Sequence, residues 1–205
     1  MSSSEDDLPQ CAGPRAVCSR VDLYARPWAE RLCRCPSGRQ CPSGTGTADG
    51  RTVADKNRLL KLCSPVRELP RCRFFTDVTW TVVAEADNTT QQLVHCRCPR
   101  GAVAYLVGQR SLPPATAPAP AASPRLQYSF ACSPQSRLRC HRKEPCRLFT
   151  VRKRQGLVDE ANVSTLCQCP LGHECPVHHT DRDVVQSHAY PRDAFRVYSG
   201  YCTPR

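Results

Sequence analysis

The stretch that decides the fold is "LCRCPSGRQCP", Leu32–Pro42, in which the cysteines follow the spacing C-x-C-P-x-G-x-x-C. Such a string can hold a metal, form a redox centre or staple a small fold. A redox centre needs a C-x-x-C thiol pair, and the sequence contains no C-x-x-C. The chain has 16 cysteines in 205 residues, a density near that of disulfide-stapled proteins. We therefore favour disulfides.

Zinc is the main alternative for these cysteines. Structural zinc sites are usually built from paired C-x2–4-C or Cys/His knuckles. Histidines lie near one copy of the motif, in "GHECPVHHT", as His173, His178 and His179. The other copies have no matching histidines, so zinc is the weaker hypothesis. We interpret the His178–His179 pair as part of a surface loop.

The C-x-C-P motif is one landmark of an internal repeat. It occurs three times, beginning at Cys33, Cys96 and Cys167. A lone cysteine precedes each copy, and a Cys-x-Pro triplet follows each one; these cysteines are Cys18, Cys72 and Cys146 upstream, and Cys63, Cys132 and Cys202 downstream. The landmarks predict three related modules: 1–65, 66–134 and 135–205. Each is short enough to need covalent support for its core.

The repeats also suggest disulfide partners. The first and third modules have six cysteines, and the second has four. Two cysteines absent together indicate the loss of one bond. In the second module, Ala104 occupies the position of Cys41 in the first module and Cys175 in the third. Pro65 and Val66 occupy the position of Cys11. This comparison predicts Cys11–Cys41 and Cys140–Cys175.

The four shared cysteines of each module allow three connectivities. In an extended strand Cys33 and Cys35 point to one face, about 6.5–7 Å apart, which is the outer limit for bridging. Each should therefore reach a different neighbour, although the swapped pairing stays open. The preferred bonds are Cys18–Cys33, Cys35–Cys63, Cys72–Cys96, Cys98–Cys132, Cys146–Cys167 and Cys169–Cys202.

The local pattern indicates an all-β, disulfide-rich fold. Val78, Trp80 and Val82 alternate with polar residues, as in a half-buried strand, and 93–98 reads as the returning strand of a hairpin. The segment 53–62 could form a short helix. The segment 111–124 contains five prolines and predicts a loop inside the second module.

Charge bounds the possible partners. The formal net charge is +11, and eight Lys or Arg residues lie between Arg137 and Arg154. This run would suit heparan sulfate, nucleic acid or an acidic protein, or it is a solvated pair of strands. The richness in cysteine argues against a nuclear or cytosolic role with nucleic acid.

Other features favour a secreted binding protein. The start, "MSSSEDDLPQ", has no apolar segment of a signal peptide, so we expect residue 1 to be the edge of a processed or truncated form. No apolar run is long enough for a membrane span. Asn88 and Asn162 begin glycosylation sequons. No nucleophile elbow or phosphate-binding glycine loop occurs, which predicts a non-catalytic protein without a cofactor.

The same residues resemble the Argos (Giant-lens) family, secreted insect antagonists of epidermal growth factor (EGF) receptor signalling. The matching strings cover almost the whole chain in order; they include "SEDDLP", "TVADK", "HCRCPR", "ACSP", "RLRC", "LFTVRKRQ", "LCQCP" and "YSGYC". Two departures are the missing secretory leader and the shortness of the segment after the first C-x-C-P, where family members can carry a long polar insertion.

The resemblance implies more than the spacing does. It implies three modules similar to three-finger-toxin and urokinase-receptor domains, arranged as a clamp around an activating EGF-like ligand such as Spitz. The antagonist would sequester the ligand, with one ligand to one antagonist, and leave the receptor unoccupied.

Aromatic residues and arginines are the usual hot spots of such an interface. Trp80 alternates with valines and Phe149 resembles Phe75 in the repeat, so a structural role competes with binding at both. The candidates are Trp28, Trp80, Tyr105, Phe149, Arg152 and Tyr198.

Overall fold

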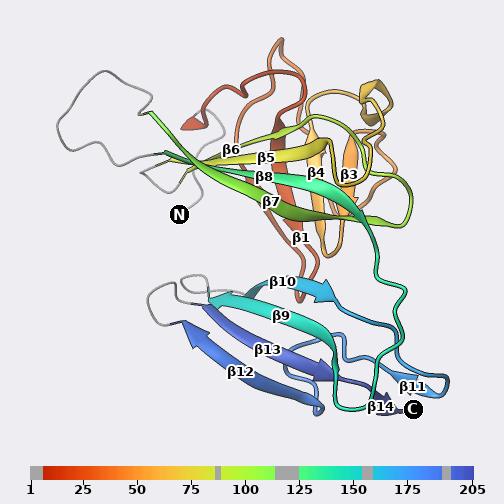
Figure 1. The fold of residues 1–205 in the computed structure, drawn as a ribbon. Coiled ribbons are helices and arrows are strands. Elements are labelled where there is room, and N and C mark those ends of the chain that lie inside the picture. Colours follow the sequence, from red (N-terminus) through yellow and green to blue (C-terminus); the bar gives the residue numbers. More distant parts are fainter. Residues whose placement is uncertain (1–6, 86–88, 114–124, 154–158, 191–194) are drawn as a thin grey trace. The chain divides into compact units, whose positions relative to one another are not determined.

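The computed structural model describes residues 7–85, 89–113, 125–153, 159–190 and 195–205 (Figure 1). Within these ranges the chain forms antiparallel sheets joined by loops, with a short 3-10 helix, η2 (Val66–Glu68). This architecture confirms the all-β, disulfide-rich class. Among the described residues, no helix has the length and apolarity that a membrane crossing requires.

Three four-stranded sheets follow one another along the chain. The first has the order β2-β1-β4-β3, the second β6-β5-β8-β7 and the third β10-β9-β13-β12. The first consists of β1 (Val17–Asp22), β2 (Trp28–Arg31), β3 (Thr52–Asp55) and β4 (Arg58–Leu62). The second consists of β5 (Val78–Ala84), β6 (Thr90–Val94), β7 (Ala102–Leu112) and β8 (Arg125–Pro134). The third consists of β9 (Pro145–Lys153), β10 (Asp159–Thr165), β12 (Val184–Tyr190) and β13 (Phe195–Tyr201), and β11 (His173–Glu174) pairs with β14 (Thr203–Pro204) beside it.

The chain divides into two compact units. One comprises residues 1–21 and 28–134, and the other comprises 22–27 and 135–205. The first unit thus holds the first and second sheets, and the second unit holds the third sheet. The division into modules 1–65, 66–134 and 135–205 places one sheet in each module, and we keep it as a proposal.

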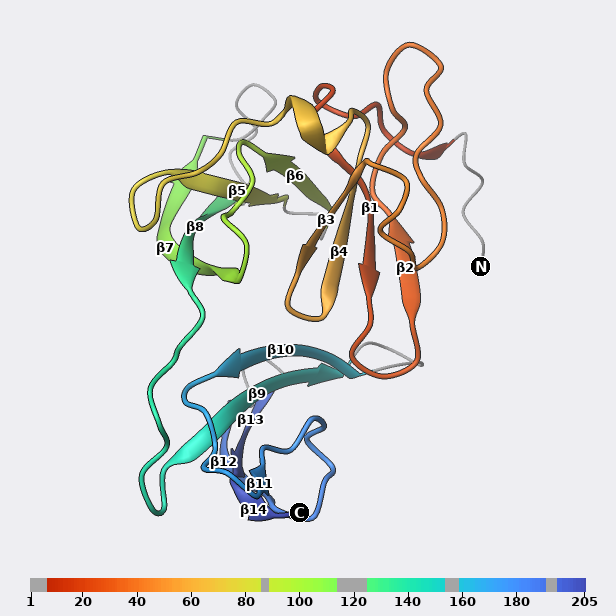
Figure 2. The same cartoon turned by 90° about the vertical axis from the view of Figure 1, so that its right-hand side faces the viewer.

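In the first unit the two sheets share a core (Figure 2). Alternation along β5 turns Trp80 toward the first sheet, and its ring stacks on Phe130 with centroids 4.5 Å apart. The backbone N–H of Ala104 in β7 donates to Asp55 Oδ1 at 2.9 Å. The buried residues of this core are Val17, Leu60, Leu62, Leu69, Trp80 and Val94.

In the second unit the core lies on one face of the third sheet. Phe149 and Ala161 are fully buried there, and Val151 packs beside them. Tyr24, from the segment 22–27 that belongs to this unit, has its ring centroid 6.2 Å from that of Phe149. The opposite face of β9 and β10 is more exposed, with Arg152 opposite Glu160.

The segment 53–62 is a hairpin, β3–β4, so the helix expected there is wrong. Four consecutive residues of β4 are buried, which hides the period of two that marks a strand. One of them is Lys61, and its ammonium group pairs with Asp49 at 2.8 Å. Burial acts to raise the pKa of Asp49, but hydrogen bonds from Lys61 and Thr52 outweigh it and hold that pKa below its ordinary value.

The proline-rich loop predicted at 111–124 falls largely outside the described residues. Its first two residues, Ser111 and Leu112, complete β7, and residues 114–124 are not described.

All sixteen cysteines form disulfides, and the pairs differ in part from those expected. Cys35–Cys63, Cys72–Cys96, Cys98–Cys132 and Cys169–Cys202 are bonded as the sequence suggested. The other four predicted pairs, Cys11–Cys41, Cys18–Cys33, Cys140–Cys175 and Cys146–Cys167, are wrong. The structure instead bonds Cys11–Cys33, Cys18–Cys41, Cys140–Cys167 and Cys146–Cys175.

The backbone explains the exchange of partners. The middle residue of each C-x-C motif forms a parallel bridge with the residue before a cysteine: Arg34 with Gln10, Arg97 with Arg71, and Gln168 with Arg139. The bridge sets Cys11, Cys72 and Cys140 beside the first cysteine of the motif. Cys72 is therefore the counterpart of Cys11 and Cys140, and not of Cys18 and Cys146 as the similar strings "RCRFFT" and "PCRLFT" suggested.

A second hydrogen bond identifies the position that lost its cysteine. The carbonyl of Cys18 accepts from Leu32 N–H, and the carbonyl of Cys146 accepts from Leu166 N–H. In the second module the same bond joins the carbonyl of Thr79 to His95 N–H. Thr79 therefore occupies the place of Cys18 and Cys146, and Ala104 remains the counterpart of Cys41 and Cys175.

This correspondence predicts that Thr79→Cys with Ala104→Cys forms a ninth disulfide. Both positions are buried, and the new loop should stabilise the fold by about 2–3 kcal/mol. Intact mass, peptide mapping and thermal unfolding measure the result. The matched control is Val66→Cys with Ala104→Cys, which follows the rejected alignment and should leave two free thiols. A bond in the control and not in the first variant would contradict the correspondence.

Candidate binding surface

The second sheet has one face against the core of the first unit and a second face that carries polar side chains. Because side chains alternate along a strand, the residues next to Trp80 and Phe130 point away from that core. They are Thr81 on β5 and Ser129 on β8, which are directly opposite each other in the register. Across β8 they meet Gly108 on the edge strand β7. We refer to this side of the sheet as the open face.

A shallow groove runs over the open face. Its hydrogen bonds join Thr81 Oγ1 to His95 Nε2 at 3.0 Å and Arg110 to Gln127 Oε1 at 3.0 Å. Gly108 has no side chain to fill the groove, and a bulge in β7 adjoins it. The groove offers hydrogen-bond donors and acceptors for recognition of a partner. The lining residues are Val78, Thr81, His95, Gly108, Gln109, Arg110, Gln127 and Ser129.

His95 is a titratable group in the lining of this groove. Partial burial lowers the pKa of its imidazole below the ordinary value, and the charge of Arg15 lowers it further. His95 is therefore neutral at pH 7, and its Nε2 can accept the hydrogen bond of the Thr81 hydroxyl. Protonation would convert Nε2 into a donor and remove that acceptor.

Two of the predicted binding residues are in the core. Trp80 is 5% exposed and Phe149 is 0% exposed, so neither presents a contact surface to a partner. The structural role that competed with binding is therefore the correct one for both. Phe75 is 63% exposed, so its likeness to Phe149 in the repeat does not extend to the fold.

The other four predicted binding residues are exposed or half-buried, two in each unit. In the first unit, Trp28 is half-buried on β2 with the guanidinium of Arg20 5.5 Å from its ring centroid, and Tyr105 is half-buried on β7. In the second unit, Arg152 is exposed on β9, and Tyr198 is half-buried against the core. Binding by these four remains a prediction.

The sequence did not predict the groove or the position of Phe75 beside Tyr105. The ring centroid of Phe75 lies 6.3 Å from that of Tyr105. The alternation of polar residues along β5 was the available signal for the open face. The groove also needs the pairing of β7 with β8, strands that residues 113–124 separate in the sequence, and no local pattern predicts that pairing.

The histidine pair in "GHECPVHHT" lies in a loop, and His178 is half-buried, but the prediction of a surface position is wrong for His179. His179 is 9% exposed, and its Nδ1 lies 2.9 Å from the hydroxyl oxygen of Tyr24. That oxygen also accepts from the backbone N–H of His179 at 2.8 Å, and the ring of His178 stacks on Tyr24 at 4.7 Å. The pair is part of the packing of the second unit.

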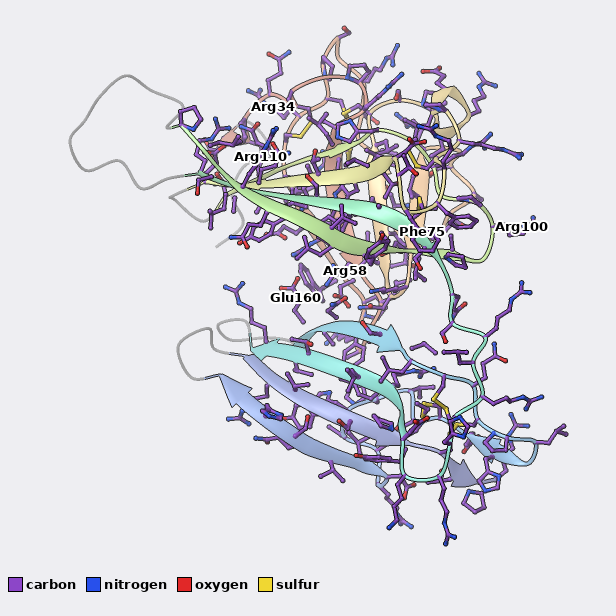
Figure 3. The ribbon with its side chains drawn as sticks, in the orientation of Figure 1. Arg34, Arg58, Phe75, Arg100, Arg110 and Glu160 are labelled. Carbon is purple, nitrogen blue, oxygen red and sulfur yellow. A yellow bond between two sulfur atoms is a disulfide. The ribbon has the colours of Figure 1, made fainter. Side chains whose placement is uncertain are left out.

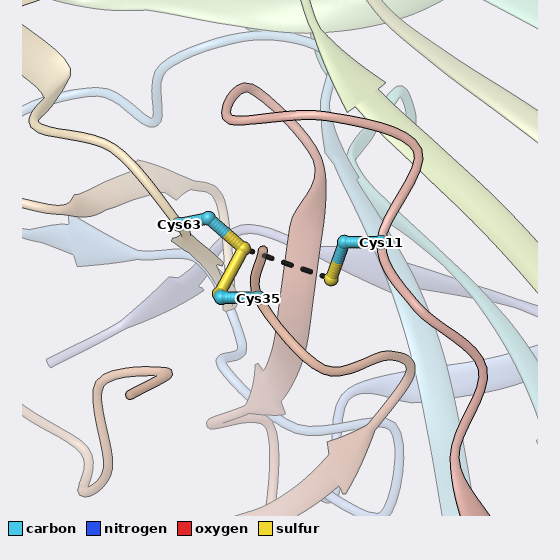
Figure 4. Close-up of side chains that lie close together, drawn as sticks. All are labelled: Cys11, Cys35 and Cys63. Carbon is cyan, nitrogen blue, oxygen red and sulfur yellow. Dashed lines mark hydrogen bonds between the residues drawn. A yellow bond between two sulfur atoms is a disulfide. The ribbon is translucent and has the colours of Figure 1, made fainter. Parts of the chain in front are cut away.

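The clustered cysteine sulfurs do not provide zinc ligands. Sγ of Cys11 lies 3.6 Å from Sγ of Cys63, which is bonded to Cys35 (Figure 4). Neither sulfur carries a proton, because both belong to disulfides, so the contact joins two stacked bonds. A cysteine binds zinc as a thiolate, and every cysteine here is oxidised.

The basic run begins with an exposed connecting segment. Arg137, Arg139, Arg142 and Lys143 all lie at the surface between β8 and β9. Arg147 is half-buried and donates to the carbonyl of Pro176. Lys153 and Arg154 have no described side chains.

Of the two glycosylation sequons, only the one at Asn162 has its asparagine among the described residues. Asn162 is exposed on β10, the edge strand of the third sheet. Asn88 lies outside the described residues.

These features define a class: an all-β protein held by eight disulfides, with a hydrogen-bonding groove on one sheet. A family model described as "Antagonist of EGFR signalling, Argos" matches residues 51–184. "Protein giant-lens" of Drosophila melanogaster is 34% identical over 318 residues, which covers 98% of this chain and 70% of that protein. A crystal structure of unliganded Argos is 52% identical, with a TM-score of 0.61, and the match covers 100% of this chain and 96% of the other. The chain belongs to the Argos family, antagonists of EGF receptor signalling.

The low pKa of His95 predicts a pH dependence of stability. Because the folded state lowers the pKa of His95, His95 binds a proton less well in the folded state than in the unfolded state. The contribution of neutral His95 to stability should therefore be fully present above the unfolded pKa of about 6.5. It should be lost as the pH falls through that value toward the folded pKa. Unfolding by urea at pH 7 and pH 5 should show a smaller difference for His95→Gln than for the wild type. His173→Gln, an exposed site, is the control. An NMR titration giving His95 a pKa at or above its ordinary value would contradict the prediction.

Proposed function

We propose that the chain is a secreted, stoichiometric trap that binds an activating EGF-like ligand and sequesters it without binding the receptor. The observation that carries the proposal is membership of a family of antagonists of EGF receptor signalling, in a chain whose open sheet face is suited to recognition rather than catalysis. Oxidation of every cysteine supports an extracellular location. The clamp arrangement of three modules remains a prediction of the resemblance.

The scaffold suits a trap that acts by binding alone. Eight disulfides fix the loops and hairpins before the ligand arrives, so less conformational entropy is lost on association. An inhibitor without turnover must match its target mole for mole, and tight binding from a rigid surface achieves this. Asn162 projects from an exposed edge strand, and we include its glycosylation in the proposal.

The proposal predicts a one-to-one complex with an EGF-like ligand. Calorimetry should show saturation at one ligand per chain, and surface plasmon resonance should show no binding to the receptor ectodomain. Receptor phosphorylation in cells should fall steeply once the protein reaches the ligand concentration. Inhibition that persists with excess ligand, or direct binding to the receptor, would contradict sequestration.

The exposed basic segment favours a second candidate, binding of heparan sulfate. Four cationic side chains, Arg137, Arg139, Arg142 and Lys143, lie within seven residues of chain, and clustered cations attract sulfated polysaccharides. They lie in the connection between β8 and β9 and not on a strand, so the alternative of a solvated pair of strands applies only to the later part of the basic run.

Replacing these four residues by serine should lower the salt concentration at which the protein elutes from heparin. The control replaces four dispersed exposed arginines, Arg34, Arg67, Arg110 and Arg182, and so removes the same charge. Specific binding predicts a larger shift for the clustered variant than for the control. Equal shifts would show that only general charge acts.

A further inference from the structure

A tight turn before β5 displays two aromatic side chains. Phe74 is 36% exposed and Phe75 is 63% exposed. Hydrogen bonds hold the turn in place: Phe75 N–H in its middle donates to the carbonyl of Cys132 at 2.9 Å, and Arg73 N–H at its start donates to Asp77 Oδ2 at its end at 2.8 Å. The carboxylate of Asp77 also pairs with the Arg73 guanidinium at 2.9 Å. The two aromatic rings are therefore held on a rigid support.

The backbone of Phe75 has an unfavourable conformation for its residue type. Its φ is +61°, in the left-handed region that favours glycine or asparagine. The equivalent turn of the third module has Lys143 at φ +71°, three residues after Cys140 as Phe75 is three after Cys72. The turn thus belongs to the scaffold, but neither its conformation nor burial accounts for a phenylalanine there.

Cationic and aromatic groups share this end of the second sheet. β5 and β7 both pair antiparallel with β8, so the connections that precede them lie at the same end. Phe75 is in one connection and the exposed Arg100 is in the other, and Figure 3 shows both at this end with Arg110 farther along β7. Tyr105 is beside Phe75. The cluster adjoins the groove at Val78, three residues after Phe75.

We propose that Phe74, Phe75 and Tyr105 form the anchor by which the open face docks the EGF-like ligand, with Arg100 at its rim. The inference rests on the proposed function and names its contact surface. Aromatic residues and arginine on a preorganised support are typical of interface hot spots. The partner surface must offer an apolar site flanked by carboxylates. A second copy of this chain fits poorly, because it would bring Arg100 against Arg100 in a protein of net charge +11.

The test replaces Phe75 by glycine in the full chain. Phe75→Gly should weaken ligand binding by at least about tenfold in calorimetry, because the anchor ring is lost. The midpoint of thermal unfolding should stay the same or rise, because glycine accepts the positive φ. Lys143→Gly, at the same turn of the third module, should show the same thermal response with ligand affinity within about twofold of the wild type. Leu171→Ala removes another exposed apolar side chain, which is 92% exposed, and should also retain affinity.

Charge reversal tests the rim separately. Arg100→Glu should lower the association rate and weaken its dependence on salt, because the proposed partner surface presents carboxylates; an unchanged rate and salt dependence would overturn the role of Arg100 at the rim. Full affinity in Phe75→Gly would overturn the anchor, and so would a wild-type dimer in sedimentation that this variant abolishes. Absence of binding by the wild type to every EGF-like ligand would instead overturn the proposed function, so the two failures are distinguishable.

Discussion

The fold depends on the constraint that the C-x-C motif places on two neighbouring segments. Its middle residue forms a parallel bridge to the residue before the first cysteine of the module, and the flanking cysteines form disulfides to different partners. In the second module these are Cys72–Cys96 and Cys98–Cys132. Each bond contributes about 2–4 kcal/mol by constraining the unfolded chain. Modules of this size bury too little apolar surface to dispense with that contribution.

The second module has one bond fewer and compensates through packing. Thr79 occupies the position of Cys18 in the first module and Cys146 in the third. Its hydroxyl donates to the carbonyl of Cys96 at 2.6 Å, which joins β5 to the C-x-C motif without a covalent bond. On the next residue, Trp80 enters the core shared with the first sheet. The second sheet therefore has one disulfide fewer than the others and shares its core with the first sheet, in the same compact unit; its other face is the open face.

The sequence predicts the fold class and the repeat well, because cysteine spacing and alternation are local signals. The disulfide partners were half wrong for an identifiable reason. Cys72 resembles Cys146 in the residues that follow it, but it corresponds to Cys140 in the backbone, and only the parallel bridge reveals this. The error extended to Phe75, which was compared with the buried Phe149. The open face depends on strands that pair across long connections, so its groove could not be predicted from local patterns.

The three modules share a backbone scaffold but differ in the side chains that one of its turns presents. The turn after the first cysteine of each module keeps its place beside the C-x-C motif, but its third residue is Pro14 in the first module, Phe75 in the second and Lys143 in the third. Proline cannot adopt a positive φ, so the first module has no left-handed residue at this position. In the other two the same backbone displays an aromatic ring in one case and an ammonium group in the other. Since the backbone of these turns is already ordered, binding of a partner there loses little conformational entropy of the turn. The same backbone turn can therefore present chemically different side chains to a partner, an aromatic ring in the second module and an ammonium group in the third.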